Sequence, residues 1–176
     1  MKCSSLVLAA AALGVVFLNA AHADQSGSQK SGVAPVANVV YAKECGACHY
    51  AYPPGLMTAA SWNKVLSNLS NHFGENAELP ADTMKTVTDY ATANAADKST
   101  YRLSQKIARS TGNTAPTRIS EIPYIAREHR EIMGRYVKNN PKVGSLSKCQ
   151  LCHTDADKGT FTERAINIPG HGAWGE

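Results

Sequence analysis

The sequence has few aromatic residues and few of the alternating apolar and polar segments that are typical of β-strands. Tryptophan, tyrosine and phenylalanine together make up 7% of the 176 residues, which is a modest supply for a hydrophobic core. A half-buried strand alternates from one residue to the next, so the scarcity of this pattern argues against an all-β fold. Segments with a period of about 3.6 residues dominate instead, and they predict a mainly α fold with little or no sheet.

Long basic runs, and basic residues interleaved with aromatic ones, are also missing. The composition therefore argues against a nucleic-acid partner. The charge is nevertheless uneven along the chain: residues 24–99 hold five basic and seven acidic residues, a net of −2, whereas residues 100–176 hold 12 and seven, a net of +5. Such a dipole can orient a docking partner, although a solvated face without a role is the commoner explanation.

Only one long apolar run is present, from Leu6 to Leu18, near the start of the chain. It follows Lys2 and precedes the small-x-small sequence Ala21-His22-Ala23, so the parts of a secretory signal peptide occur in order. The run is shorter than the roughly 20 residues that a membrane-spanning helix needs. We therefore expect a signal peptide over residues 1–23 and an exported mature protein without a transmembrane segment.

Removal of this leader leaves four cysteines, which form two copies of one pattern. CGACH occupies 45–49 and CQLCH occupies 149–153, and C-x-x-C-H is the attachment signature of c-type haem. In such a site two thiols add across the vinyl groups of the porphyrin, and the next histidine supplies the proximal ligand to iron. The motifs predict two covalently bound c-type haems, with thioether bonds from Cys45, Cys48, Cys149 and Cys152 and proximal ligands from His49 and His153.

Other uses of paired cysteines fit these motifs less well. The two halves of a Cys₄ zinc site usually lie about 15–20 residues apart, whereas these pairs begin 104 residues apart (149 minus 45). A thioredoxin-like motif would have a single pair near a βαβ pattern, and no such pattern is visible. Plain disulfides suit an exported protein, but they do not require a histidine after each pair.

The polar, turn-rich stretch 110–118 is the candidate junction between two lobes. We expect an N-terminal haem-binding lobe over 24–110 and a C-terminal haem-binding lobe over 111–176. Apolar residues at helical spacing predict helices within these lobes, and a last helix begins at Pro123 and is stopped by the Asn-Asn-Pro sequence at 139–141. The other predicted helices cover 61–74, 80–97 and 99–109.

The second axial ligand of each iron decides the function, because a strong ligand favours electron transfer while an open position permits binding or catalysis. His72 lies on the apolar face of the predicted helix 61–74, 23 residues after the first proximal histidine. His129 lies on the apolar face of the last predicted helix, 24 residues before the second. These positions favour His72 for the first iron and His129 for the second. The remaining candidates are His171, Met57, Met84 and Met133, of which Met133 and His171 rival His129.

The quoted residues also carry a family resemblance. The stretch CGACHYAYPPGLMTAASWNKVLSNLSNHFGENAEL, with IPYIAREHREI and the late CQLCH, resembles the dihaem cytochrome c family of periplasmic proteins from purple and other Gram-negative bacteria. The resemblance runs from about Tyr41 to about Ile168. It implies a mostly helical protein whose first lobe resembles a small helical cytochrome c. It also implies two bis-histidine haems, held by His49 with His72 and by His153 with His129; the tail around GHGAW matches no part of the pattern.

The resemblance implies a periplasmic electron carrier rather than an enzyme. Its expected donor is a membrane quinol-linked cytochrome b, and its expected acceptor is a soluble redox protein such as an oxygen-binding monohaem cytochrome. Two His/His irons should have lower potentials than His/Met irons. The alternative is a dihaem peroxidase or small-molecule reductase with one open haem site. A haem-dependent sensor, or a bound subunit whose second haem changes ligand on docking, is a third interpretation.

Overall fold

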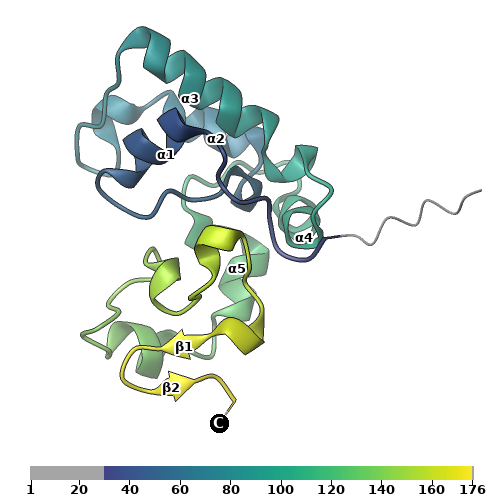
Figure 1. Cartoon of the computed structure of the whole chain (residues 1–176), viewed down its shortest axis with the longest axis vertical. Helices are drawn as coiled ribbons and strands as arrows, with labels where there is room; N and C mark the ends of the chain where they lie inside the picture. Colours follow the sequence, from purple (N-terminus) through teal and green to yellow (C-terminus); the bar gives the residue numbers. More distant parts are fainter. Residues whose placement is uncertain (1–29, 176) are drawn as a thin grey trace, which may run out of the picture.

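The computed structural model describes residues 30–175, which fold mainly into helices (Figure 1). The predicted signal peptide and its cleavage site lie outside this range. One end of the molecule holds α1 (Val39–Gly46), α2 (Ala59–Leu66), α3 (Ala81–Ala93) and α4 (Arg102–Thr111), and α5 (Pro123–Glu128) runs into the other end. Within the described range, no helix has the length and apolar character needed to cross a membrane.

The sheet is limited to two short antiparallel strands near the C-terminus. β1 (Asn167–Ile168) pairs with β2 (Gly172–Ala173), so that Asn167 lies opposite Ala173. The mainly α fold with little sheet is therefore confirmed. A π-helical segment covers Met133–Lys138, and short 3₁₀ turns cover Pro54–Leu56, Leu69–Asn71, Ala96–Lys98, Ile119–Glu121, Cys149–Leu151, Ala156–Lys158 and Glu163–Ala165.

The hydrophobic core of the first part of the chain lies among α1, α2, α3 and α4, and it includes Ile107 on α4. Val87 and Ala91 on α3 are fully buried, and their spacing of four residues places them on one face of the helix. Trp62 on α2 packs edge-on against Tyr41 of α1, with ring centroids 6.2 Å apart. The indole Nε1 of Trp62 donates a hydrogen bond of 2.8 Å to the carbonyl of Pro54. This bond ties α2 to the Pro-Pro-Gly turn that follows the first haem motif.

The helix predicted over 61–74 is wrong in its second half, because α2 ends at Leu66. The next residues read Ser-Asn-Leu-Ser-Asn, and short polar side chains of this kind compete with the helix for backbone hydrogen bonds. Ser67 Oγ donates to the carbonyl of Lys64 at 3.2 Å, and Asn68 Nδ2 donates to the carbonyl of Asn71 at 3.4 Å. The chain therefore leaves the helix before it reaches His72.

The helix predicted from Pro123 to the residues before 139 is also interrupted. α5 ends at Glu128, and the chain becomes helical again only in the π-helical segment. The break coincides with His129, whose Nδ1 is hydrogen-bonded to the Ile125 carbonyl at 2.8 Å. Irregular turns of this kind are frequent where a helix places a functional side chain. The predicted lobe boundary at 110/111 stays a prediction, although α4 does end beside it.

The start of the described chain packs directly against the segment that follows the second haem motif. The Val33 amide donates to the Gly159 carbonyl at 3.0 Å. A side chain at Gly159 would bring its Cβ within 2.1 Å of the Val33 carbonyl oxygen, and Gly159 has a positive φ of 73°. This contact therefore requires glycine both for its conformation and for its lack of a side chain.

Substitution of this glycine should destabilise the protein strongly. For Gly159→Ala we expect a loss of about 2–5 kcal/mol, from the positive φ together with the backbone clash. Gly144 is a matched control, because its φ is 74° and nothing lies within 4 Å of the point that an added Cβ would occupy. Gly144→Ala should cost only about 1–2 kcal/mol. Thermal unfolding of the haem-loaded proteins measures both losses, and equal losses would contradict the close contact.

Candidate haem centres

The rings of the first pair of predicted iron ligands lie close together. The ring centroids of His49 and His72 are 6.1 Å apart, and the ring planes differ by 23°. An iron–nitrogen bond of about 2 Å on each side, and about 1 Å from each nitrogen to its ring centre, places two coordinated imidazoles about 6 Å apart. The observed separation therefore fits one iron between the two rings. Cys45 lies in the last turn of α1, so this helix carries the start of the motif.

A tight turn, rather than a helix face, presents His72. The His72 amide donates to the Glu75 carbonyl at 2.7 Å, and the Glu75 amide donates back to the His72 carbonyl at 3.2 Å. The two residues between them, Phe73 and Gly74, have φ values of 58° and 105°, as in the mirror-image turns of β-hairpins. A positive φ costs a bulky residue about 1–2 kcal/mol, and such strain is concentrated at functional sites.

The surroundings of His72 favour its neutral form. Burial lowers its pKa, and the nearby His49 and Arg118 lower it further because they disfavour another positive charge. The guanidinium of Arg118 lies over the Phe73 ring, 4.1 Å from its centroid. Neutral imidazole is the form that binds a metal, so this environment prepares the side chain for ligation.

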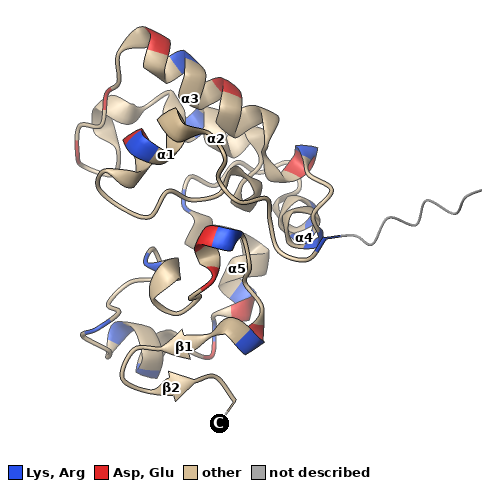
Figure 2. Ribbon diagram, viewed as in Figure 1, with Lys and Arg blue, Asp and Glu red and all other residues tan. Residues whose placement is uncertain are grey.

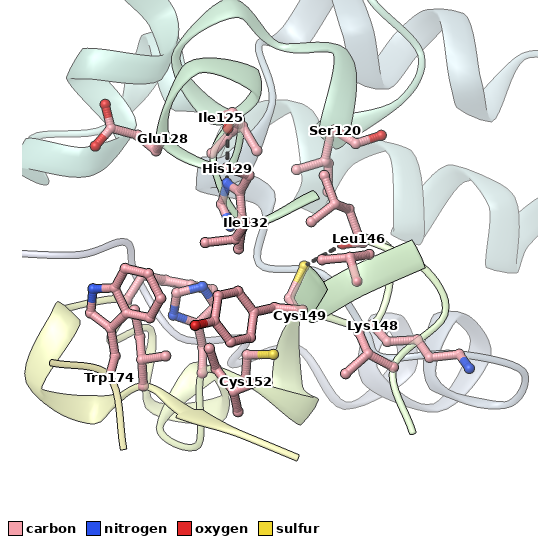
Figure 3. A pocket seen from close by; sticks show the side chains of 18 of the residues that line it. Ser120, Ile125, Glu128, His129, Ile132, Leu146, Lys148, Cys149, Cys152 and Trp174 are labelled. Atoms are coloured by element: carbon pink, nitrogen blue, oxygen red, sulfur yellow. Dashed lines mark hydrogen bonds between the residues drawn. The ribbon is translucent and has the colours of Figure 1, made fainter. Parts of the chain in front are cut away.

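The second pair of predicted ligands faces each other across a cavity. The ring centroids of His129 and His153 are 6.0 Å apart, with planes inclined by 69°. Both rings line a cavity of about 320 Å³, together with Cys149 and Cys152. Figure 3 shows His129, the residue that directly follows α5, on one side of the cavity and Cys149 and Cys152 on the other. The four side chains of the predicted second site therefore meet in one place.

The walls of this cavity are mostly apolar, as a porphyrin requires. Its volume is within the range of about 300–1,000 Å³ that is usual for small-molecule sites. Trp174, near the C-terminus, forms part of the wall (Figure 3). Leu56 and Leu103 contribute from residues 30–110, called the first half below, so this part and residues 111–175, called the second half, both shape the site. The other apolar lining residues include Ile119, Ile125, Ile132, Val143, Leu146, Phe161, Ile166 and Ile168.

Hydrogen bonds from Nδ1 orient two of the four imidazoles. His49 Nδ1 is 2.7 Å from the Tyr50 carbonyl, and His129 Nδ1 is 2.8 Å from the Ile125 carbonyl. Bonds of this kind fix the tautomer and leave Nε2 for a metal. His153 Nδ1 is buried and has no hydrogen-bond partner within residues 30–175. Burial and His129 lower the pKa of His153 to about 4, so this ring is also neutral.

The rival ligands lie elsewhere. Neither Met133 nor His171 is among the residues that line the cavity, and the His171 ring packs against Tyr136 with centroids 5.0 Å apart. Met57 is only 2% exposed in the core, and the Met84 sulfur lies 3.6 Å from the Thr88 hydroxyl. The geometry thus brings together the two histidine pairs that the sequence favours.

Two aromatic neighbours of the second site were missed by reasoning from the sequence. Phe161 lies against the His153 ring, with centroids 5.2 Å apart, and Trp174 borders the cavity. Neither residue belongs to a motif or to an apolar stripe, so no local signal identified it. All four cysteines within the described range are free of disulfide bonds, which leaves both pairs available for thioether bonds.

The sequence model of the family described as "Dihaem cytochrome c" matches residues 41–161. The chain belongs to the dihaem cytochrome c family. A diheme cytochrome type c from Shewanella baltica OS155 is 39% identical, with a TM-score of 0.65 over 78% of this chain and 97% of that one. The diheme cytochrome c from Rhodobacter sphaeroides is 36% identical, with a TM-score of 0.64 over 74% of this chain and 100% of that one. A comparison with curated protein sequences finds no match.

As a dihaem cytochrome c, the chain carries two c-type haems with their irons. The residues at both sites fit this cofactor, because each site combines a C-x-x-C pair with two imidazoles at the right separation. The family consists of electron-carrier cytochromes that work with redox partners. The match ends at Phe161, so Trp174 and His171 lie beyond the region that defines the family.

Proposed function

We propose that this dihaem cytochrome c transfers single electrons through two bis-histidine haems. His49 and His72 would ligate the first iron, and His129 and His153 the second. The observation that carries the proposal is the centroid separation of 6.1 Å and 6.0 Å in the two histidine pairs. The thioether bonds would come from Cys45, Cys48, Cys149 and Cys152.

When bound, each haem supplies an iron that alternates between the ferric and ferrous states. The protein holds the ligands still while this happens. The Nδ1 hydrogen bonds of His49 and His129 keep their rings in place, and the turn that begins at His72 is closed by two backbone hydrogen bonds. Two rigid histidine ligands at each iron would keep the coordination nearly the same in both oxidation states. That property favours electron transfer over the binding of small molecules.

The enzymatic alternative requires an open iron beside a group that transfers protons. Glu128 and Glu131 border the second cavity, but both are exposed to solvent. Glu128 also forms an ion pair of 3.0 Å with Arg127. The residue across from His153 is His129, and their ring separation of 6.0 Å fits a second iron ligand rather than a proton-transfer group beside an open iron. The geometry therefore supports an electron carrier better than a peroxidase or a reductase.

We place this electron transfer in the periplasm, after removal of residues 1–23. The proposed donor is a membrane quinol-linked cytochrome b, and the proposed acceptor is a soluble protein such as an oxygen-binding monohaem cytochrome. The difference in net charge, −2 over residues 24–99 and +5 over 100–176, would help to orient such partners. Figure 2 shows basic residues at several separate places in the half that contains α5, not in one continuous patch.

A redox titration of the haem-loaded protein tests this proposal. We expect two reversible one-electron steps at low potential, because both irons would carry His/His ligands. Neither carbon monoxide binding to the reduced protein nor peroxide turnover should exceed the level of a buffer control. Rapid carbon monoxide binding at native pH, or turnover of peroxide, would show an open iron and favour the enzymatic alternative.

A further inference from the structure

Two tyrosines that follow the first haem motif reach across to the second. Tyr50 Oη donates to the carbonyl of Ala156 at 2.5 Å, and Tyr52 Oη donates to the carbonyl of Ser147. Ser147 lies two residues before the second C-x-x-C-H motif and Ala156 lies three residues after it. The two hydroxyl groups therefore hold the second motif on both sides, although each bond joins residues about a hundred positions apart in the sequence.

The same tyrosines are in contact with the first site. The Tyr52 ring lies against His49, with centroids 5.1 Å apart and planes inclined by 32°. Tyr50 packs edge-on against Tyr52, with centroids 5.5 Å apart. Tyr52 thus touches the proposed proximal ligand of one iron and is hydrogen-bonded to the backbone beside the attachment site of the other.

This pair is anchored firmly to the core of the first half. The carbonyl of Tyr52 accepts a hydrogen bond of 2.7 Å from the hydroxyl of Tyr41, and Tyr41 is only 1% exposed. The residues after Tyr52 form the buried Pro-Pro-Gly turn, to which Trp62 donates its hydrogen bond. A side chain supported in this way can hold another group in a fixed position.

We propose that Tyr50 and Tyr52 form an inter-haem clamp, defined by these two residues, that sets the relative position of the two haem motifs. In doing so it controls how fast an electron passes between the haems. The inference rests on the proposed electron-transfer function. In the step concerned, one iron is oxidised from ferrous to ferric as the other is reduced from ferric to ferrous, and no proton or co-reactant is needed. The tyrosines are positioning residues in this step.

The test removes both hydroxyl groups and keeps both rings. In the haem-loaded Tyr50→Phe/Tyr52→Phe variant we expect two covalent haems with unchanged visible spectra. The rate of electron exchange between the haems in the half-reduced protein, measured by NMR exchange spectroscopy, should fall several-fold. The magnetic coupling between the two oxidised irons, measured by electron paramagnetic resonance, should weaken. Amide hydrogen exchange should accelerate around residues 145–148 and 154–159.

Tyr90→Phe is a matched control. Its hydroxyl also bonds to the backbone, accepting from the Ala37 amide at 2.8 Å, but the bond stays within the first half. This variant should leave electron exchange and magnetic coupling unchanged. The contact of Val33 with Gly159 remains in every variant, so the two halves stay joined. If the double variant still loses a haem, the two single variants are compared, and each should show an intermediate slowing.

Equal exchange rates and equal magnetic coupling in the double variant and the unmodified protein would overturn the clamp. That outcome differs from a failure of the proposed function itself. If the haems do not undergo reversible one-electron reduction, the unmodified protein will already show no exchange. The measurement on the unmodified protein therefore separates the two results.

Discussion

Replacement of Cys149 and Cys152 with serine should leave one covalent haem in place of two and should loosen the second half of the protein. The second haem site is a cavity of about 320 Å³. At about 24 cal/mol per Å³, an empty cavity of this size costs up to about 8 kcal/mol, which is comparable with the whole stability of about 5–15 kcal/mol of a typical domain. Without its haem, this region should therefore collapse or unfold.

The matched variant replaces Cys45 and Cys48 with serine. It should also retain one covalent haem, but Trp62, Val87 and the rest of the first core are buried by contacts among protein side chains. We expect its first half to unfold cooperatively, whereas the second half of the Cys149/Cys152 variant should not. Covalent haem is counted after acid–acetone extraction, and unfolding is followed by circular dichroism. Two covalent haems in either variant would contradict the assignment of the motifs.

Replacement of His129 with alanine should open the second iron. The ring centroid of His129 lies 6.0 Å from that of His153. Loss of the His129 side chain would leave the iron with one protein ligand. We expect a high-spin ferric signal from one haem, and binding of one carbon monoxide per reduced chain. The other haem should keep its low-spin signal, because its ligands lie in the first half.

The rival ligands provide the controls for this prediction. His171→Ala and Met133→Leu should keep both low-spin signals, since neither side chain lines the cavity. The same electron paramagnetic resonance and carbon monoxide measurements apply to all three variants. If the low-spin signal of the second haem disappears in His171→Ala alone, His171 holds the iron and His129 does not.

Local sequence patterns were sufficient to predict the cofactor, because the attachment of a c-type haem needs residues that are close together in the chain. The two C-x-x-C-H motifs predicted two haems, and membership of the family confirms them. The mainly helical fold followed from hydrophobic periodicity. The sequence has few aromatic residues to fill a core, and the second half correspondingly surrounds a cavity lined with apolar side chains.

The local conformation at the distal histidines was harder to predict. Periodicity placed His72 on a helix, but it begins a tight turn with a positive φ at Phe73. Periodicity placed His129 in the middle of a helix, but it follows the last residue of α5. Side-chain hydrogen bonds to the backbone override the helical pattern at both places. In each case the spacing pointed to the histidine that lies opposite the proximal one, but it predicted the wrong backbone conformation.

Contacts between distant segments could not be predicted from one sequence. The bond from Tyr50 to Ala156 joins residues 106 positions apart, and no short motif encodes such a pair. The approach of Trp174 to the second cavity likewise depends on how β1 and β2 fold back the end of the chain. These long-range contacts are created by tertiary packing, and they include the clamp that we propose.

Low-temperature electron paramagnetic resonance of the fully oxidised, unmodified protein tests the central claim most directly. Two bis-histidine irons predict two low-spin ferric signals and no high-spin signal. The ring planes differ by 23° in the first pair and by 69° in the second. Near-parallel imidazoles should give a rhombic signal, and strongly inclined ones a highly anisotropic signal. A stoichiometric high-spin signal, or a signal of the His/Met type from either haem, would contradict the account.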